Sequence, residues 1–575
     1  MTGFEIGNYI YICKNIMMRF FNEYICPHNE RCMRDKSFFN NPYLIILMLM
    51  RMNAKKLMTA IAFVAMALAT ASGQITKEQL QTCSDEQLLR EWTKVLASDE
   101  FGGRKPMTPY EDKTVDYLAR QLEVMGLEPA FNGSWFQPFD MIAVTAKPVG
   151  SRLTVSGKKK SVLRYPDDLI IWTTRATEKI DLKKAEYVFC GFGINAPEYG
   201  WNDYEGIDVK GKIVVVMVND PGFYDSNLFR GRNMTYYGRW TYKFEEARRQ
   251  GAVGCLVLHH AEAASYGWHV CVNGHLSNNL GIYDPATRNA DELAVRGWLH
   301  EEGCKKLFLA AGMDMDKALA DAKKPGFKSF ALNVRGDVKM NVAYDIQQTR
   351  NVGGILRGSG HDGEAVVFCA HWDHLGIGKA DERGDTIYNG AADNASGMAG
   401  ALLVAKKFKE MPQPRRDLLF FFPSSEESGL FGSAYYCDHP AVPMAKTVAC
   451  LNFESIGPAE LTRDVVILGG GESDLDHYYV AAAAAQGRYI YFDDDNSDGW
   501  FYRSDHYNFV KKGVHAVVLE NGRHPVDVSK PNKYPMPVWY HKPCDEYRDD
   551  WDMSGTLSNV NLIFSVGLSL SNKSR

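Results

Sequence analysis

Residues that can bind metal ions or move protons follow several apolar stretches of the chain. The first such group is AHWDHLG (370–376), directly after the apolar run 365–369. Its two histidines and one aspartate suit a metal site, since imidazole and carboxylate are the usual ligands of zinc. Their spacing alone does not decide which histidine would bind, so the rest of the chain has to be considered.

Four further groups stand at the ends of predicted elements. Glu426 and Glu427 follow the apolar run 418–422, Glu454 follows 447–453, Asp393 precedes a predicted helix, and His541 lies near the C-terminus. Each alone has a structural explanation: Asp393 could cap its helix, and the paired glutamates could form a solvated turn. Because all of them occur at suitable element ends, we expect a common site.

Metal-dependent hydrolysis explains this set of residue types. Two divalent ions can share one carboxylate, take one further imidazole and acid each, and keep positions open for water and a substrate carbonyl. An adjacent carboxylate that binds no metal can accept a proton from that water and return it to the leaving group. The Glu426-Glu427 pair suits these two tasks, because neighbouring side chains on extended backbone point in alternate directions. We therefore expect two Zn²⁺ ions, with other divalent metals as alternatives.

The elements that must position these residues alternate between strand and helix after residue 333. Strands are predicted at 366–369, 418–422, 447–453, 465–468 and 516–519, and a helix at 396–410. This alternation predicts an α/β fold with a mixed central sheet flanked by helices. Ligands of such sheets bind beyond the carboxyl ends of the strands, where the candidate residues stand.

Two segments with other sequence patterns precede this region. A helix is predicted from Ser84 to Leu96, and a second one opens with a capping box at Thr108 and Glu111 and ends at Gly126. From residue 163 to 333 the chain contains short β-rich runs separated by turns rich in glycine and aspartate.

The order of motifs resembles the co-catalytic di-zinc exopeptidases, which include bacterial leucyl aminopeptidases and glutamate carboxypeptidase. The motifs are His-x-Asp, Gly-Ala-x-Asp-Asn-Ala-Ser-Gly, Glu-Glu-x-Gly-Leu-x-Gly-Ser, Asn-x-acid-x-Ile-Gly, Ser-Asp-His and Tyr-His-x-x-x-Asp. The segment 163–333, with GFGI (191–194) and YGWNDY (199–204), resembles the protease-associated (PA) domain that is inserted in several such proteins.

The resemblance implies a role for each candidate. His371 and Glu454 would bind one metal, His541 the other, and Asp393 would bridge them. Glu427 would be a further ligand, and whether it belongs with His371 or His541 is left open. Glu426 would be the general base.

Less direct roles are implied for two more residues. Asp373 would orient the imidazole of His371, and Tyr540 would donate its phenol to the developing oxyanion; the alternative is that Tyr540 only packs beside His541. The chain departs from the family pattern at Glu454, where many relatives have Asp, and at Ala392, which replaces an Asp that is not a ligand.

The length of the chain suits a protein of two domains, and one N-terminal segment suggests export. The 575 residues are 23% charged and 45% hydrophobic, with a formal net charge of −5, which argues against nucleic acid as a partner. Residues 52–73 predict a signal peptide, with a short membrane anchor as the alternative. Residues 1–51 would then be a non-native upstream extension, and no stable membrane insertion is expected after cleavage.

These observations predict an exported, periplasmic or extracellular di-zinc exopeptidase that acts on peptides, with aminopeptidase favoured. The expected divisions are 74–162 (first part of the peptidase domain), 163–333 (PA-like insertion) and 334–575 (zinc peptidase domain). One alternative is a metallocarboxypeptidase with a basic pocket that includes Arg503 or Arg523; an aminopeptidase would use acids such as 493–495. The other is a non-catalytic, receptor-like protein on the same scaffold.

Overall fold

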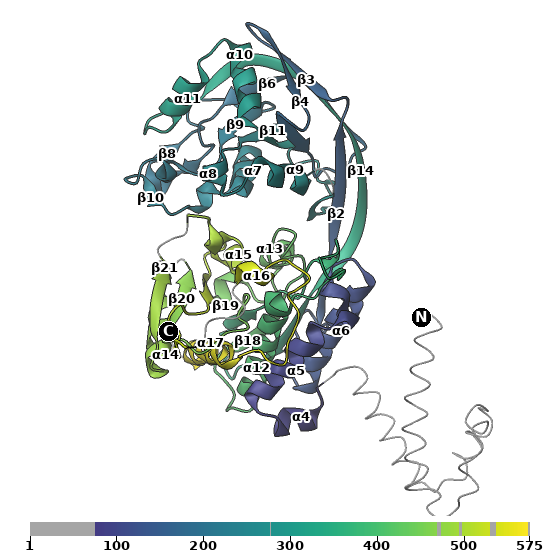
Figure 1. The fold of residues 1–575 in the computed structure, drawn as a ribbon, viewed down its shortest axis with the longest axis vertical. Helices are drawn as coiled ribbons and strands as arrows, with labels where there is room; N and C mark the ends of the chain where they lie inside the picture. Colours follow the sequence, from purple (N-terminus) through teal and green to yellow (C-terminus); the bar gives the residue numbers. More distant parts are fainter. Residues whose placement is uncertain are drawn as a thin grey trace, which may run out of the picture. The chain divides into compact units, whose positions relative to one another are not determined.

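The computed structural model describes residues 75–275, 278–360, 362–468, 473–493, 497–529 and 536–572. All of them belong to one compact unit, Ile75–Arg575 (Figure 1). The expected upstream extension 1–51 and the signal peptide 52–73 lie outside the described residues, as do Asp494 and Asp495.

A mixed sheet carries the candidate site, as the sequence predicts. Its strands run in the order β1 (Glu128–Pro129), β14 (Phe330–Leu356), β18 (Asp417–Phe422), β15 (Ala365–Cys369), β19 (Thr447–Asn452), β22 (His515–Glu520), β20 (Asp464–Leu468) and β21 (Tyr489–Asp493). Strands β18, β15, β19 and β22 are parallel to one another, whereas β14 runs antiparallel to β18 and β20 runs antiparallel to β22. The carboxyl ends of the four parallel strands therefore meet at one edge.

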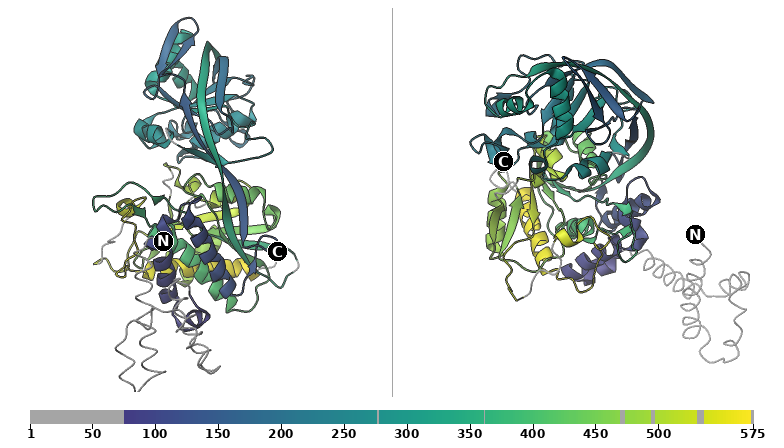
Figure 2. Two further views of the ribbon diagram at one scale, coloured as in Figure 1. Left: turned by 90° about the vertical axis from the view of Figure 1, so that its right-hand side faces the viewer. Right: turned by 45° about the horizontal axis from the view of Figure 1, so that its top comes forward.

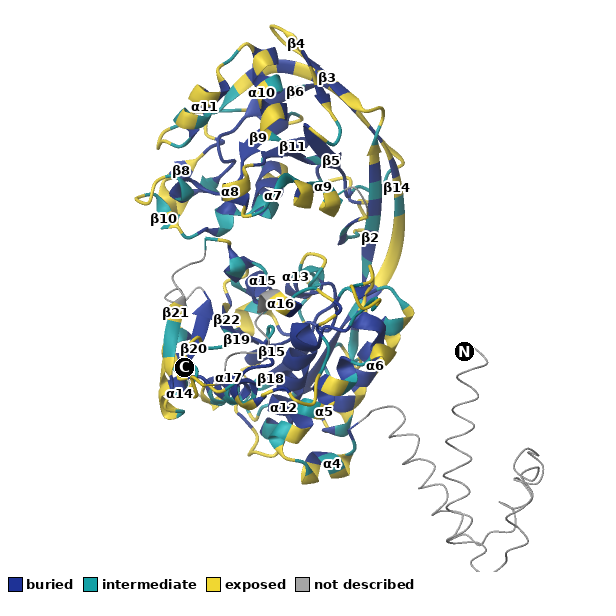
Figure 3. Ribbon diagram, in the orientation of Figure 1, coloured by how far each residue is buried: buried dark blue, intermediate teal, exposed yellow. Residues whose placement is uncertain are grey.

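Both faces of this sheet are buried, which explains why its strands are continuous apolar runs. Val366 and Phe368 of β15 join the hydrophobic cluster that includes residues of α5 (Asp85–Leu96), α6 (Pro109–Val124), α12 (Ser396–Lys409) and α17 (Ser554–Asn572). Val367 and Cys369 point to the other face, where residues of α13 (Phe431–Asp438) and α15 (His506–Val510) cover them. Figure 3 shows the central strands as buried.

The two N-terminal helices begin and end near the predicted residues. Ser84 caps α5, because its side chain accepts the N–H of Gln87 while the Gln87 side chain accepts the N–H of Ser84. Helix α6 starts at Pro109 and is followed by Gly126 at φ +78°, which only glycine adopts readily. The capping box predicted at Thr108 is wrong: its hydroxyl donates to the Lys105 carbonyl instead.

Strands β2 (Phe136–Pro148) and β14 form a long antiparallel ribbon that leads to a second hydrophobic cluster (Figure 2). Parallel strands β6 (Lys179–Phe189), β9 (Ile213–Met217), β11 (Gly254–Leu258) and β13 (Val295–Leu299) lie there, accompanied by α7 (Trp240–Arg249) and α10 (Glu301–Ala311). This region thus combines strands with helices, and α7 lies where the sequence predicts a helix over 243–250. Its PA-like assignment and the divisions at 163 and 333 stay predictions.

The remaining elements are shorter or lie further from the candidate site. The strands are β3 (Arg152–Ser156), β4 (Lys160–Arg164), β5 (Leu169–Trp172), β7 (Asn195–Ala196), β8 (Trp201–Asn202), β10 (Phe229–Arg232), β12 (Asn279–Ile282), β16 (Gly376–Ile377) and β17 (Ile387–Tyr388). The helices are α4 (Lys77–Thr82), α8 (Ala261–Ala264), α9 (Trp268–His275), α11 (Met315–Ala322), α14 (Asp476–Ala485) and α16 (Met536–Trp539).

No helix among the described residues combines the length and the apolar character needed to cross a membrane. The nine cysteines from Cys83 to Cys544, all within the described ranges, form no disulfide there, and seven of them are buried. Those seven behave as small hydrophobic residues.

Candidate metal centre

The candidate residues converge at the carboxyl edge of the parallel strands. His371 comes two residues after β15, Glu454 two residues after β19, and the Glu426-Glu427 turn follows β18. Asp393 lies in the turn 391–395 that leads into α12. Since β18, β15 and β19, labelled in Figure 3, are neighbouring parallel strands, residues that follow them must lie close together.

The first group of ligand atoms surrounds the imidazole of His371. Its Nε2 lies 3.4 Å from Oδ1 of Asp393 and 3.5 Å from Oε1 of Glu454. The other ring nitrogen, Nδ1, lies 3.1 Å from the carbonyl oxygen of Asp373. A proton on Nδ1 leaves the lone pair of Nε2 free for a metal, which is the arrangement that metal-binding histidines require.

The second group surrounds His541. Its Nε2 lies 3.4 Å from Oδ2 of Asp393 and 2.9 Å from Oε2 of Glu427. Glu427 thus lies with His541, which the sequence left open. Asp393 turns one carboxylate oxygen to each imidazole, the geometry of a bridging ligand.

The distances in both groups fit a bound zinc ion. Ligand atoms about 2.0–2.1 Å from a tetrahedral zinc are roughly 3.3 Å from one another. The four contacts of His371 and His541 to their carboxylates span 2.9–3.5 Å. The Nε2 atoms of both histidines, and that of the nearby His374, are buried and have no hydrogen-bond partner among the described residues. Such unpartnered atoms are expected where a metal binds.

A third histidine also lies within reach of these ligands. His374, Asp393 and Glu427 form a further cluster of potential ligands. Nδ1 of His374 is, however, only 2.5 Å from Oε1 of Glu427, which is shorter than the separation of two ligand atoms on one tetrahedral zinc ion. We therefore assign the second group to His541.

Asp373 holds the turn that carries the paired glutamates. Its two carboxylate oxygens accept the main-chain N–H groups of Glu426, at 3.0 Å, and Glu427, at 3.3 Å. The same carboxylate is 3.8 Å from Nδ1 of His371. Asp373 therefore orients His371 through its own carbonyl group and the Glu-Glu turn through its side chain.

Glu454 is held by a chain of hydrogen bonds. Ser504 Oγ donates to Glu454 Oε2 at 2.5 Å, and Asn452 Nδ2 donates to Ser504 Oγ at 2.8 Å. These bonds leave Oε1 of Glu454 directed at His371. The Ser-Asp-His segment thus contributes a positioning hydroxyl.

Tyr540 lies against the second group. Its ring stacks on His541, with centroids 3.8 Å apart and planes 17° apart. Burial, together with the carboxylates of Asp393 and Glu427, raises the pKa of the phenol above its ordinary value, so it remains a hydrogen-bond donor at neutral pH. Its contribution to an oxyanion site stays a prediction.

The carboxyl groups of the site titrate differently from one another. Burial and the nearby carboxylates of Glu454 and Glu427 raise the pKa of Glu426 well above its ordinary value, against the opposing effect of His371. Burial would also raise the pKa of Glu427, but the imidazoles of His374 and His541 lower this pKa to about 2. Without bound metal, Glu426 therefore holds its proton more tightly than Glu427 does.

Two residues that support the site were not assigned a role from the sequence. Asp545, the last residue of the Tyr-His-x-x-x-Asp motif, accepts the main-chain N–H groups of Ala392, at 2.8 Å, and Asp393, at 3.1 Å. Asp545 therefore fixes the turn that presents the bridging carboxylate.

Arg104 is the second such residue, and it comes from the N-terminal segment. Its fully buried guanidinium donates to the carbonyl oxygens of Leu96, Trp372, Asn389 and Gly390. It thereby joins the loop after β15 to the loop before α12. Burial lowers its pKa only to about 10, so Arg104 is cationic at neutral pH. The Gly102-Gly103 turn before it has no local pattern that indicates these contacts.

Replacing Arg104 with methionine is expected to lower the free energy of unfolding by about 3 kcal/mol, because four carbonyl oxygens lose their buried donor. Urea unfolding would measure the change, with Arg104→Lys as the matched control. Lysine keeps the charge but cannot reach all four acceptors, so its loss should be smaller. Unchanged stability of the methionine variant would contradict the assigned role.

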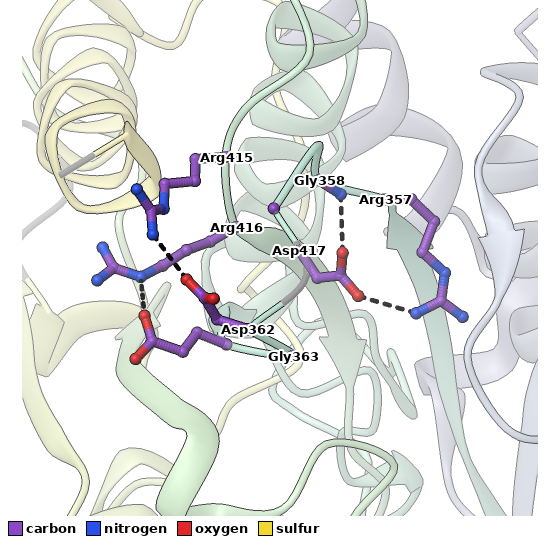
Figure 4. A pocket seen from close by; sticks show the side chains of 9 residues that line it. Arg357, Gly358, Asp362, Gly363, Arg415, Arg416 and Asp417 are labelled. Carbon is purple, nitrogen blue, oxygen red and sulfur yellow. Dashed lines mark hydrogen bonds and ion pairs between the residues drawn. The ribbon is translucent and has the colours of Figure 1, made fainter. Parts of the chain in front are cut away.

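The pocket in Figure 4 is separate from this centre. It has a volume of about 250 Å³ and lies before the first residues of β15 and β18, at the opposite ends of the strands. Its three arginines pair with acids of the pocket: Arg357 with Asp417, Arg415 with Asp362, and Arg416 with Glu364. The arginines are thus already neutralised.

The fold and this donor set define a metal-dependent enzyme, with ligands at the carboxyl edge of an α/β sheet. Residues 351–564 match the model of peptidase family M28. This part of the chain is therefore similar to the peptidases of family M28, which agrees with the metal-dependent enzyme that the donor set defines.

Solved structures with a similar fold include two bacterial enzymes. One is the aminopeptidase from Aneurinibacillus sp. strain AM-1, with 18% identity, a TM-score of 0.46, and coverage of 87% of this chain and 97% of that chain. The other is BSAP, a zinc aminopeptidase from Bacillus subtilis, with 17% identity, a TM-score of 0.40, and coverage of 85% and 96%. No curated protein sequence matches the chain.

Proposed function

We propose that the protein is an exported aminopeptidase that uses two zinc ions to hydrolyse the first peptide bond of its substrates. The observation that carries this proposal is the position of Asp393, which presents one oxygen to the His371 group and the other to the His541 group. When bound, two zinc ions would polarise the substrate carbonyl and lower the pKa of a water molecule.

Glu426 is the residue placed to move the proton. It belongs to neither ligand group, and its main chain is held by Asp373. Glu426 accepts a proton from the attacking water and delivers it to the amine that leaves when the C–N bond breaks. Tyr540 is placed beside His541 to donate a hydrogen bond to the carbonyl oxygen.

The charge around the site favours a substrate with a free amino terminus. Seven carboxyl groups gather in and around the two ligand groups: Asp373, Asp393, Glu426, Glu427, Glu454, Asp505 and Asp545. Arg104 lies among them, but its guanidinium nitrogens are engaged with carbonyl groups. The charges of Asp393, Glu427 and Glu454 would be offset by the zinc ions, so we infer the preference for an ammonium group from the carboxyl groups that would bind no metal.

A carboxypeptidase is the second candidate, because Arg503 lies near the centre. Its guanidinium is 4.6 Å from the ring centroid of Trp500, which is 6.1 Å from the ring of Tyr540. Arg523, the other candidate, lies over Tyr491. Only Arg503 is thus linked to the centre by these ring contacts.

Export is part of the proposal because of the signal peptide expected at 52–73, and the segment 163–333 is proposed as a PA-like insertion. Sequencing the N-terminus of the native mature protein would test the first point. A start near residue 74 is expected.

The activity is tested by comparing aminoacyl-arylamides with amino-blocked dipeptides as substrates of the zinc-loaded protein, alongside elemental analysis of zinc. Hydrolysis of the arylamides and about two zinc ions per chain are expected. Hydrolysis of blocked dipeptides alone would identify a carboxypeptidase. Bound zinc without hydrolysis of either substrate would contradict the proposed function and favour a receptor-like protein.

A further inference from the structure

His374 is a buried imidazole beside the second ligand group, and neither that group nor the proton transfer uses it. It follows β15 by five residues and is fully enclosed. Its Nδ1 lies 2.5 Å from Oε1 of Glu427, while Oε2 of the same carboxylate faces His541 at 2.9 Å. The two oxygens of Glu427 therefore have different neighbours.

The distance between Nδ1 of His374 and Oε1 of Glu427 indicates whether His374 is a metal ligand or a hydrogen-bond donor. Two ligand atoms on one tetrahedral zinc lie roughly 3.3 Å apart, close to the separations around His371 and between His541 and Asp393. At 2.5 Å, Nδ1 of His374 and Oε1 of Glu427 are too near to share one ion in this way. A charge-assisted hydrogen bond between an N–H group and a carboxylate, about 2.7–2.9 Å long, is closer to this separation than a pair of zinc ligands is.

The ring of His374 is fixed in this orientation by its surroundings. Its main-chain N–H donates to the carbonyl of Arg104 at 3.3 Å. Gly390, at φ +59°, lies against the ring: a Cβ atom there would be 2.6 Å from Cδ2 of His374. Side chains larger than glycine are thus excluded at position 390, and the imidazole has little room to turn away from Glu427.

We propose that His374 is a positioning residue that donates its Nδ1–H to Oε1 of Glu427 and so presents only Oε2 to the metal held with His541 and Asp393. Glu427 then binds through a single oxygen. If both oxygens of Glu427 bound the metal, they would fill one more coordination position. With one oxygen bound, that position stays available for water or substrate, as a catalytic metal site requires. This inference rests on the proposed two-zinc site.

The test compares His374→Leu with His374→Asn in the full chain. Leucine and asparagine have nearly the same shape, but only asparagine carries an N–H group close to the position of Nδ1. Zinc affinity is measured by competition with a chromophoric chelator, and kcat is measured at several zinc concentrations. The metal-free variants are first compared with the parent protein by circular dichroism and thermal unfolding.

In the leucine variant, one of the two zinc ions is expected to bind about 10–100-fold more weakly, the usual effect of removing an outer hydrogen-bond partner. Excess zinc should restore most of its kcat, and the asparagine variant should resemble the parent protein. Equal zinc affinities in the leucine variant and the parent protein would overturn the proposal. So would equal losses in both variants, which would indicate packing alone.

X-ray absorption of the zinc-loaded parent protein supplies an independent readout. Two imidazoles for two zinc ions are expected; a third would make His374 a ligand and overturn the proposal. A protein that binds two zinc ions as described but hydrolyses no peptide would refute the proposed function and leave the role of His374 intact. The two failures are thus distinguishable.

Discussion

Replacing Glu426 with glutamine is expected to lower kcat by about 10²–10⁴-fold while zinc binding is retained, because general acid–base catalysis contributes that much. Glu426 lies in neither ligand group, and glutamine preserves its size and its main-chain bond to Asp373. Its carboxyl group lies beside Glu454 and Glu427 and has a raised pKa, which suits a group that must accept a proton and then release it. Glutamine can do neither.

The measurement is kcat with an aminoacyl-arylamide, together with zinc content after dialysis. Glu427→Gln is the matched control, because it changes the neighbouring ligand and should lose zinc as well as activity. A Glu426→Gln variant that keeps near-normal kcat would contradict the assignment. A variant that loses zinc would show that Glu426 supports the metals.

The second large effect is expected for Asp393→Ala, which should lose both zinc ions and nearly all hydrolysis. Each group would keep only one imidazole and one carboxylate: His371 with Glu454, and His541 with Glu427. An outer hydrogen-bond partner alone contributes about 10–100-fold to metal affinity, so the shared ligand should contribute more than about 10²-fold at each position.

Elemental analysis after dialysis and kcat/KM would test this expectation. Asp393→Asn is the control, because its amide retains one oxygen and turns an NH₂ group to the other side. One zinc ion should remain in that variant and fewer than one in Asp393→Ala. Two tightly bound ions in the alanine variant would refute the bridging role of Asp393.

Much of the sheet could be predicted because its signals are local. Each strand that carries the site is a short apolar run, and the structure places β15, β18, β19, β20 and β22 within one or two residues of the predicted bounds. The capping box at Thr108 failed for an equally local reason. Glu111 accepts the N–H of Met107, and the Thr108 hydroxyl donates to Lys105, so neither side chain completes the predicted pair.

The sequence by itself determined which residue types would meet, because parallel strands bring the residues at their carboxyl ends to a common edge. His371, Glu426, Glu427 and Glu454 could be selected on that ground, and Asp393 from its place before a helix. Only the tertiary structure decided that Glu427 lies with His541 and that His374 contacts the opposite oxygen of Glu427. Those choices depend on differences of about 1 Å in the distances between side-chain atoms, and the side chains come from loops that are far apart in the chain. The same holds for Arg104, whose contacts span more than 260 residues. Hydrophobic periodicity is a property of neighbouring residues and cannot encode such contacts.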